Sequence, residues 1–217
     1  MMTKLSKNVI VDTGCANLSS VKFAVQRLGY AVTITDNVDL IKQADKVIFP
    51  GVGSAKHAMA NIKAKNLVGV LQQLTQPVLG FCLGMQLMTE SSTEGKSCAM
   101  TTANDSTIAC LNLIPTKIEP LKAQGNRLPH MGWNTLKSVA NHPIFNGITE
   151  GDYFYFVHSY FVTAENETHI KGRGHYGQDF VAAIGQDNVF AVQFHPEKSH
   201  TAGLQLLENF LNWDGQA

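Results

Sequence analysis

Cys82 lies between two glycines in the stretch Gly80-Phe81-Cys82-Leu83-Gly84, which continues an apolar run from residue 77. Glycine-x-nucleophile-x-glycine is the pattern of a nucleophile elbow, in which a strand turns sharply into a helix. Glycines are required there because neighbouring Cβ atoms would clash in so tight a turn. At the helix N-terminus, unpaired backbone N–H groups favour a thiolate, and the N–H of Leu83 would point to where an oxyanion develops. The pattern predicts a thiolate nucleophile, with a small buried structural cysteine as the alternative interpretation.

A thiolate nucleophile also needs a side chain that carries a proton to the leaving group. The sequence has eight histidines, so position must decide among them. His195 and Glu197 come directly after a predicted strand, and side chains two residues apart in an extended segment point the same way. Glu197 could thus orient His195 and stabilise its charged form. A solvated loop is the alternative, but together with Cys82 these residues predict a Cys-His-Glu catalytic triad.

A third feature is the Gly-x-Gly within residues 49–55, at the end of another predicted strand. Two glycines free the backbone to turn an N–H toward an anion. If this strand neighbours the strand before Cys82, the turn at Val52 and Gly53 would supply the second half of an oxyanion hole. A nucleotide-binding fingerprint competes, but Lys56 stands where its last glycine would be, and no acidic residue follows at about 20 residues. A plain turn is the remaining alternative.

Apolar periodicity predicts the elements that must position these residues. Apolar, often β-branched runs indicate strands at residues 8–12, 31–35, 46–50, 77–81, 153–162, 180–185 and 188–196. Helical spacing predicts helices at 18–28, within 54–74 (one or two), after Cys82 and near the C-terminal end, where one face carries Leu204, Leu207, Phe210 and Leu211. Strands that alternate with helices predict an α/β fold with a parallel sheet covered on both faces. Residues 96–108 are small and polar, which favours a surface insertion within one domain spanning residues 1–217.

The composition excludes several classes of protein. The chain has 217 residues, 44% apolar and 16% charged, which is typical of a soluble globular protein. Lys plus Arg and Asp plus Glu number 17 each, so no net charge favours nucleic acid or an anionic membrane. The N-terminal apolar run is too short for a signal sequence, and no run approaches the roughly 18 residues of a membrane span. Four cysteines without C-x-x-C spacing argue against a zinc site or a disulfide scaffold. We therefore expect a cytoplasmic protein without a metal or cofactor.

At the residues singled out above, the sequence resembles the class I glutamine amidotransferases, whose members share the G-x-C-x-G elbow and a late His-Pro-Glu. Three stretches are similar to one branch of that family, the glutaminase subunits of imidazole glycerol phosphate synthases: Pro-Gly-Val-Gly at 50–53, Pro-His-Met-Gly-Trp-Asn at 129–134 and His-Pro-Glu-Lys-Ser at 195–199. The likeness covers nearly the whole chain. It implies a single-domain fold with a mostly parallel central sheet, helices on both faces and an added antiparallel part.

The resemblance implies hydrolysis of glutamine to glutamate and ammonia through a cysteinyl thioester. Cys82 would attack the side-chain amide, and His195, held by Glu197, would protonate the departing ammonia. The oxyanion would be stabilised by N–H groups of Leu83 and of the turn at Val52 and Gly53. Four further positions would form the glutamine pocket, with Glu94 near the substrate ammonium and the backbone of the last two near the α-carboxylate: Gln86, Glu94, Ser159 and Tyr160.

The resemblance also implies a heterodimer in which ammonia passes to a barrel-shaped cyclase subunit. That partner would form imidazole glycerol phosphate and an aminoimidazole carboxamide ribonucleotide, in histidine biosynthesis. The positions that would face it are Asn17, Trp133, Tyr155 and Lys198. By residue type alone, Trp133 would be a core aromatic and Lys198 a solvated charge. Three alternatives stay open at this point: a glutaminase subunit of another synthase, a free-standing cysteine hydrolase, and a non-catalytic interaction subunit.

Overall fold

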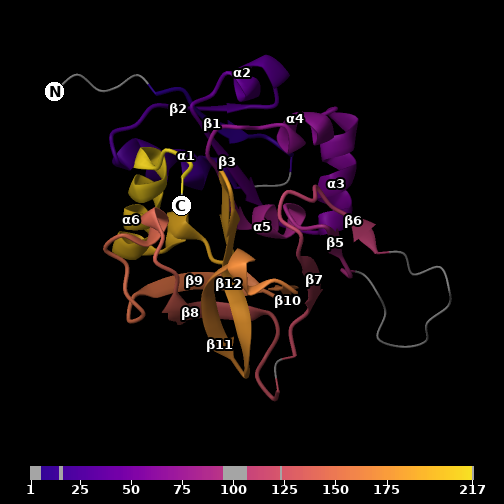
Figure 1. Ribbon diagram of the computed structural model, residues 1–217, viewed down its shortest axis with the longest axis vertical. Coiled ribbons are helices and arrows are strands. Elements are labelled where there is room, and N and C mark those ends of the chain that lie inside the picture. Colours follow the sequence, from indigo (N-terminus) through magenta and orange to yellow (C-terminus); the bar gives the residue numbers. More distant parts are fainter. Residues whose placement is uncertain (1–5, 15–16, 95–106, 123, 217) are drawn as a thin grey trace.

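The computed structural model describes residues 6–14, 17–94, 107–122 and 124–216, and its centre is a parallel sheet (Figure 1). Five strands pair in parallel in the order β2-β1-β3-β4-β13. Their bounds are β1 Asn8–Val11, β2 Val32–Thr35, β3 Lys46–Gly51, β4 Val78–Cys82 and β13 Val189–Val192. Most of these residues are buried, as expected for parallel strands covered on both faces.

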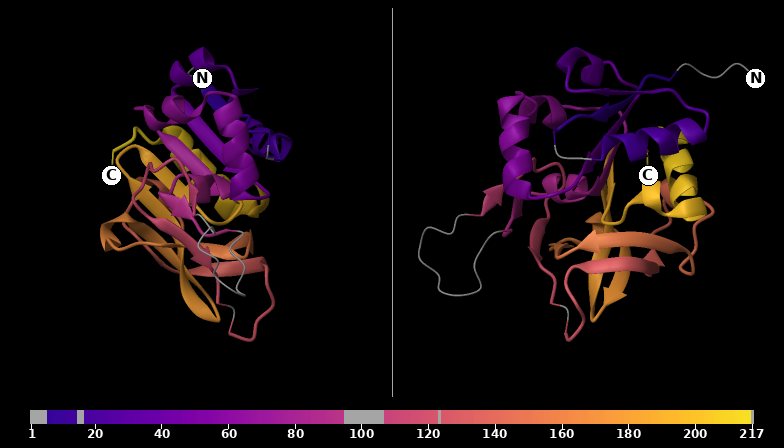
Figure 2. Two further views of the ribbon diagram at one scale, coloured as in Figure 1. Left: turned by 90° about the vertical axis from the view of Figure 1, so that its right-hand side faces the viewer. Right: turned by 180° about the vertical axis from the view of Figure 1, so that it is seen from behind.

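Successive side chains of these strands enter two separate apolar cores. In β3, Val47 and Phe49 contact one core, whereas Ile48 contacts the other. The first core contains residues of α2 (Val38–Lys42), α3 (Ala55–Ala64), α4 (Val68–Gln72) and α5 (Leu83–Leu87). The second contains residues of α1 (Leu18–Arg27) and α6 (His200–Asn212). Figures 1 and 2 show α1 and α6 together on one side of the sheet, with α3, α4 and α5 on the other.

The rest of the sheet is almost entirely antiparallel and lies below the parallel part in Figures 1 and 2. From β13 the order continues β12-β10-β7-β5-β6, in which only β5 and β7 pair in parallel, while β11, β8 and β9 branch from β12. The bounds are β5 Ser91–Ser92, β6 Ile108–Ala109, β7 Lys117–Pro120, β8 His130–Val139, β9 Tyr153–His158, β10 Tyr160–Thr163, β11 Ile170–Tyr176 and β12 Gln178–Gln186. In the described part of the chain, short 3-10 helices lie between β8 and β9 (η1 Pro143–Phe145), between β10 and β11 (η2 Glu167–His169) and between β13 and α6 (η3 Pro196–Lys198).

This architecture confirms the predicted fold class: a mixed α/β fold with a parallel central sheet, helices on both faces and an added antiparallel part. The helical region at 54–74 forms two helices, α3 and α4, and the run at 153–162 forms two strands divided at Ser159. Periodicity did not reveal α2, β8 or β11. The expected insertion at 96–108 lies outside the described residues up to 106, and Ile108 then begins β6.

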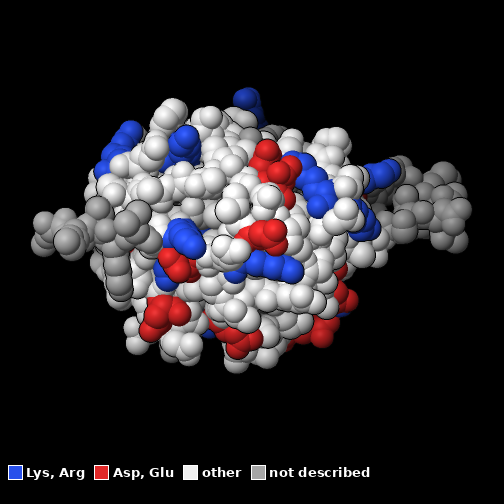
Figure 3. Space-filling view, turned by 90° about the horizontal axis from the view of Figure 1, so that it is seen from above, with Lys and Arg blue, Asp and Glu red and all other residues white. Residues whose placement is uncertain are grey.

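One face of the molecule is shown by charge in Figure 3. Lys and Arg are interspersed there with Asp and Glu, and neither sign covers a continuous area. This face therefore carries no single-sign patch that would draw a polyanion to it. Among the helices of the described residues, none combines the length and apolar character needed to cross a membrane.

Candidate active site

Cys82 is the last residue of β4 and lies immediately before α5, with φ 49° and ψ −109°. A non-glycine residue rarely adopts a positive φ, so the surrounding chain must hold this conformation in place. A Cβ at Gly84 would lie 1.9 Å from the carbonyl oxygen of Phe49, and a Cβ at Gly80 would lie 2.7 Å from Sδ of Met88. Gly84 is thus required, because the crowding atom belongs to the backbone, whereas the atoms nearest Gly80 lie at the movable end of the Met88 side chain.

The Gly-x-Gly segment begins at Gly51, the last residue of β3, and β3 is the neighbour of β4, as the oxyanion-hole interpretation requires. Gly51 pairs with Cys82 in the parallel register, and a Cβ at Gly51 would lie 2.9 Å from the backbone nitrogen of Gly84. Val52 and Gly53 come next, and Gly53 has φ +96°. The two backbones therefore approach each other at the elbow, which places the Val52–Gly53 turn beside Cys82.

His195 and Glu197 follow β13, which pairs with the other edge of β4. Nδ1 of His195 lies 2.9 Å from Oε1 of Glu197, and the two side chains are only 6% and 4% exposed. Cys82 lines the same cavity as His195, and its thiol donates to the carbonyl oxygen of Val157 at 3.6 Å. Burial by itself lowers the pKa of His195, but the interactions with Cys82 and Glu197 raise it to about 10. The structure thus brings the three predicted residues together, in an arrangement that favours the protonated form of the imidazole.

Two backbone contacts fix the segment that carries His195. Its N–H donates to the carbonyl oxygen of Tyr155 at 2.9 Å, and its own carbonyl accepts from Oγ of Ser199 at 2.6 Å. Ser199 also accepts from the N–H of Tyr155 at 3.0 Å. The imidazole is therefore positioned by β9 as well as by β13.

A cavity of about 330 Å³ opens in front of Cys82. It is lined by every residue predicted for the oxyanion hole and the glutamine pocket, together with Cys82 and His195, while Glu197 lies behind His195. The lining residues from those predictions are Val52, Gly53, Leu83, Gln86, Glu94, Ser159 and Tyr160. Burial raises the pKa of Glu94 although its carboxylate accepts a hydrogen bond from the N–H of Ala55. An anionic Glu94 would be stabilised further by a cationic ligand in this cavity.

Gln193 is a buried residue of the site that the sequence analysis did not predict. It has no exposed surface, and its Nε2 donates to Sγ of Cys82 across 3.8 Å. Its Oε1 accepts from Nε2 of Gln86 at 3.1 Å, so Gln86 is also held in place. A polar residue in the apolar run 189–194 is the sequence signal that could have identified Gln193.

A second histidine, also not predicted, lines the same cavity. His158 is 4% exposed, and its ring nitrogens lie 2.8 Å from the carbonyl oxygen of Tyr160 and 2.9 Å from Nδ1 of His130. Burial lowers the pKa of His158 to about 3, although the bond to Tyr160 opposes the shift, and the charges of His130 and His195 add to it. His158 is therefore neutral where His195 is protonated.

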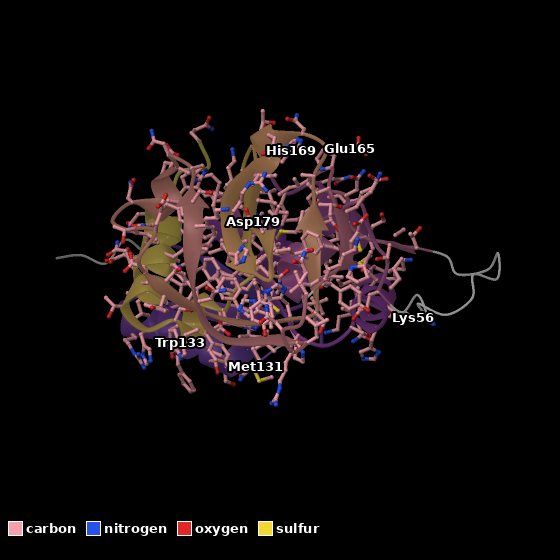
Figure 4. The ribbon with its side chains drawn as sticks, turned by 90° about the horizontal axis from the view of Figure 1, so that it is seen from below. Lys56, Met131, Trp133, Glu165, His169 and Asp179 are labelled. Atoms are coloured by element: carbon pink, nitrogen blue, oxygen red, sulfur yellow. The ribbon has the colours of Figure 1, made fainter. Side chains whose placement is uncertain are left out.

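The four residues expected to face a partner lie close to this cavity. Trp133 is 45% exposed, so it is not a core aromatic, and it meets Tyr155 edge to face with ring centroids 5.8 Å apart. Lys198 lines the cavity, and its Nζ lies 5.9 Å from the centre of the Tyr155 ring. Asn17 caps α1 and shares a small hollow with Lys198 beside Glu197. In Figure 4, which views the molecule from below, Trp133 and Met131 lie at one edge and project outward.

Within the described ranges, no three His, Cys, Asp or Glu side chains come close enough together to hold a metal ion. The cavity lining offers a thiol, two imidazoles, a carboxylate and backbone N–H groups. A thiol beside a carboxylate-oriented imidazole is suited to acyl transfer through a thioester.

The chain is similar to known proteins over nearly its whole length and nearly theirs. It matches the family described as glutamine amidotransferase class-I over residues 9–213. It is 66% identical over 213 residues to the imidazole glycerol phosphate synthase subunit HisH of Colwellia psychrerythraea, covering 96% of this chain and 94% of that protein. It is 51% identical over 202 residues to the protein of the same name from Haemophilus influenzae, covering 93% of this chain and 95% of that protein.

Solved structures resemble the fold at much lower identity. A glutamine amidotransferase crystal structure matches with a TM-score of 0.70 at 17% identity, covering 94% of this chain and 97% of that one. The structure of PurLQS from Thermotoga maritima matches with a TM-score of 0.67 at 15% identity, covering 95% of this chain and 98% of that one. These likenesses concern the fold alone.

Proposed function

Since this chain belongs to the class I glutamine amidotransferase family, we propose that it is the glutaminase subunit of an imidazole glycerol phosphate synthase. It hydrolyses glutamine to glutamate and ammonia and delivers the ammonia to a cyclase subunit. The observation that carries this proposal is the buried hydrogen bond of 2.9 Å between His195 and Glu197, with Cys82 and the same imidazole lining one cavity. The extensive identity to proteins named as HisH subunits supports this branch of the family over a sister amidotransferase.

The chemistry proceeds by two acyl transfers. The thiolate of Cys82 attacks the side-chain carbonyl carbon of glutamine, and the C–N bond breaks as the protonated His195 gives its proton to the departing ammonia. The resulting thioester is attacked by water, from which His195 takes a proton, and glutamate leaves as the C–S bond breaks. Glu197 keeps the imidazole oriented and stabilises its charged form throughout. N–H groups of Leu83 and of the Val52–Gly53 turn stabilise the oxyanion of both tetrahedral intermediates.

The cavity distributes its charges to suit free glutamine. Glu94 binds the α-ammonium, and the backbone at Ser159 and Tyr160 binds the α-carboxylate. Gln86, held by Gln193, completes the pocket beside the nucleophile. Because Glu94 is partly buried, its carboxylate is stabilised by a cationic partner, so this pocket selects a ligand that carries an ammonium group.

The partner is a barrel-shaped cyclase subunit in a heterodimer. There ammonia enters the reaction that forms imidazole glycerol phosphate and aminoimidazole carboxamide ribonucleotide in histidine biosynthesis. The surface of Asn17, Trp133, Tyr155 and Lys198 faces this cyclase, and an exposed tryptophan supported by a tyrosine is typical of the centre of an interface. We assign residues 1–217 to one domain, in the cytoplasm, acting without a cofactor, nucleic acid or membrane.

Replacing the nucleophile tests this division of labour. Cys82→Ala in the complex with the cyclase subunit should abolish synthesis of imidazole glycerol phosphate from glutamine and leave synthesis from added ammonium salt intact. The measurement is product formation with each nitrogen source, with the unmodified complex as control. Loss of both activities in a folded, assembled variant would contradict the proposal, as would retention of glutamine-dependent synthesis.

A further inference from the structure

A chain of hydrogen bonds crosses β8 and β9 and ends on the backbone of the cavity wall. His130 and His158 lie opposite each other in the antiparallel register of these strands. Nε2 of His130 lies 3.3 Å from Nδ2 of Asn134, and Nδ1 of His130 lies 2.9 Å from Nε2 of His158. Nδ1 of His158 lies 2.8 Å from the carbonyl oxygen of Tyr160. Two members of the chain, His130 and Asn134, belong to the 129–134 stretch to which the glutaminase chemistry gives no role.

From the structure we infer that His158, fixed in one tautomer by His130 and Asn134, positions the turn at Ser159 and Tyr160 for the α-carboxylate of the substrate. His158 is a positioning residue in this account, since it acts through the backbone of the turn. The inference rests on the proposed function for the identity of the ligand. The tautomer itself does not depend on that function.

The two ends of this hydrogen-bond chain require the same tautomers of His130 and His158. Oδ1 of Asn134 accepts from the N–H of Thr135 at 2.8 Å, so Nδ2 is the atom that faces His130, and an amide nitrogen can only donate. His130 must then accept at Nε2 and donate from Nδ1, which makes Nε2 of His158 an acceptor. From the other end, the carbonyl of Tyr160 can only accept, so Nδ1 of His158 carries the proton. The two requirements agree, and every bond in the chain is made with neutral imidazoles.

The last bond of the hydrogen-bond chain and a second bond, from Leu121, together fix the two successive peptides that follow Ser159 and Tyr160. The carbonyl oxygen of Ser159 accepts from the N–H of Leu121, and that of Tyr160 accepts from His158. A trans peptide is planar, so fixing the carbonyl of Ser159 toward Leu121 turns the N–H of Tyr160 to the opposite side. In an extended strand the N–H and the carbonyl of one residue point the same way, so the N–H of Tyr160 lies on the side of His158 and the cavity.

The surroundings of the hydrogen-bond chain hold its two imidazoles in place and keep them uncharged. His130 is 3% exposed and lies between two rings, with centroid distances of 4.0 Å to Tyr176 and 5.0 Å to Phe156 at angles of 20° and 18°. Burial lowers the pKa of His130 to about 4, so it is neutral at physiological pH, as His158 is. A proton on either imidazole would place two donors face to face and break the chain.

Two substitutions at His158 separate the positioning role from simple packing. In His158→Asn, the amide nitrogen takes the place of Nδ1 and still donates to Tyr160, whereas in His158→Gln it takes the place of Nε2 and reaches only His130. We expect His158→Gln to raise KM for glutamine at least about tenfold, and His158→Asn to raise it less than about threefold. Synthesis from ammonium salt by the same complexes is the control and stays unchanged. Equal KM values in the two variants, or a larger effect of Asn, would overturn the inference.

The tautomers of His130 and His158 can be measured directly in the unmodified protein. Nitrogen NMR of the protein labelled with 15N histidine should show protonated Nδ1 and unprotonated Nε2 for both His130 and His158, and His158→Gln should shift the His130 signals. Protonated Nε2 in His158 would overturn the inference without any reference to activity. Conversely, if the complex releases no glutamate from glutamine while the NMR pattern is as expected, the proposed function fails and the hydrogen-bond chain stands.

Discussion

His158 and His195 line one cavity beside Cys82, yet their surroundings shift their pKa values in opposite directions. For His195, burial opposes protonation, but the bonds and charges of Cys82 and Glu197 raise the pKa to about 10. For His158, burial dominates and lowers the pKa to about 3, since its partners are a backbone carbonyl and a neutral imidazole. The interactions of His195 with Cys82 and Glu197 therefore favour its protonated form, which we propose gives a proton to the leaving group.

Gln193 places an amide donor on Cys82, the proposed nucleophile, which predicts a role in the chemical step. In Gln193→Glu, a carboxylate of the same shape would stand 3.8 Å from the sulfur, where the Nε2 donor now stabilises negative charge on Cys82. We expect kcat for glutamine hydrolysis to fall at least about tenfold, because like charges oppose the thiolate. Steady-state kinetics of the complex measures this, with ammonium-dependent synthesis as control. An unchanged kcat would show that the contact with Cys82 has no part in catalysis.

Substitutions at Gly84 and Gly69 form a matched pair that tests the crowding at the turn after Cys82. A Cβ at Gly84 would lie 1.9 Å from the carbonyl oxygen of Phe49, whereas a Cβ at Gly69 of α4 meets nothing within 4 Å. Gly84→Ala should lower the free energy of unfolding by at least about 3 kcal/mol. Gly69→Ala should leave it unchanged or raise it by about 0.5 kcal/mol, since alanine is the better helix former. Urea unfolding of both variants checks this, and similar values for the two would contradict the crowding at Gly84.

His142, far from the cavity, predicts part of the acid sensitivity of the fold. Burial, helped by the charge of Lys171, lowers its pKa to about 4, whereas an unfolded histidine has a pKa of about 6.5. Between these values the unfolded chain binds a proton that the native chain does not. The free energy of unfolding therefore falls as the pH falls, by up to about 1.4 kcal/mol per pH unit from this residue.

His142→Asn should remove this contribution and keep the cap of η1, in which Nδ1 of His142 accepts from the N–H of Ile144 at 3.2 Å. His130 and His158 titrate in the same direction, so the pH dependence should become weaker without disappearing. Urea unfolding at about pH 7 and about pH 5 measures the slope in each protein. A slope identical to that of the unmodified chain would show that His142 is not neutral in the native state.

The sequence predicted the parts of the site that depend on local pattern. Parallel strands appear in the sequence as apolar runs, and glycines on both sides of Cys82 mark a sharp turn. The strand β8 was missed because it is half exposed and mixes polar residues with Gly132, whose φ is +137°. The short helix α2 has only five residues, too few for a helical period to be recognised.

Contacts between distant residues were not readable from local patterns. Gln193 meets Cys82 across 111 residues because β13 and β4 are neighbours, and His130 meets His158 across 28 residues because β8 and β9 pair in one register. Neither pairing follows from residue spacing. Cys82, His195 and Glu197 could be grouped from the sequence because Cys82 ends one parallel strand and the other two follow another, and parallel strands bring such ends to one edge of the sheet.

The most direct test of the central claim is glutamate release from glutamine by the purified chain, with and without the cyclase partner and its nucleotide ligand. Val52 is 41% exposed and Gly53 has a positive φ, so the turn can rest with its N–H turned away from the cavity. We expect weak activity in isolation and stimulation by the partner of about 5-fold to 150-fold, the range of typical coupling between two sites. High turnover that the partner leaves unchanged would contradict the account and indicate a free-standing hydrolase.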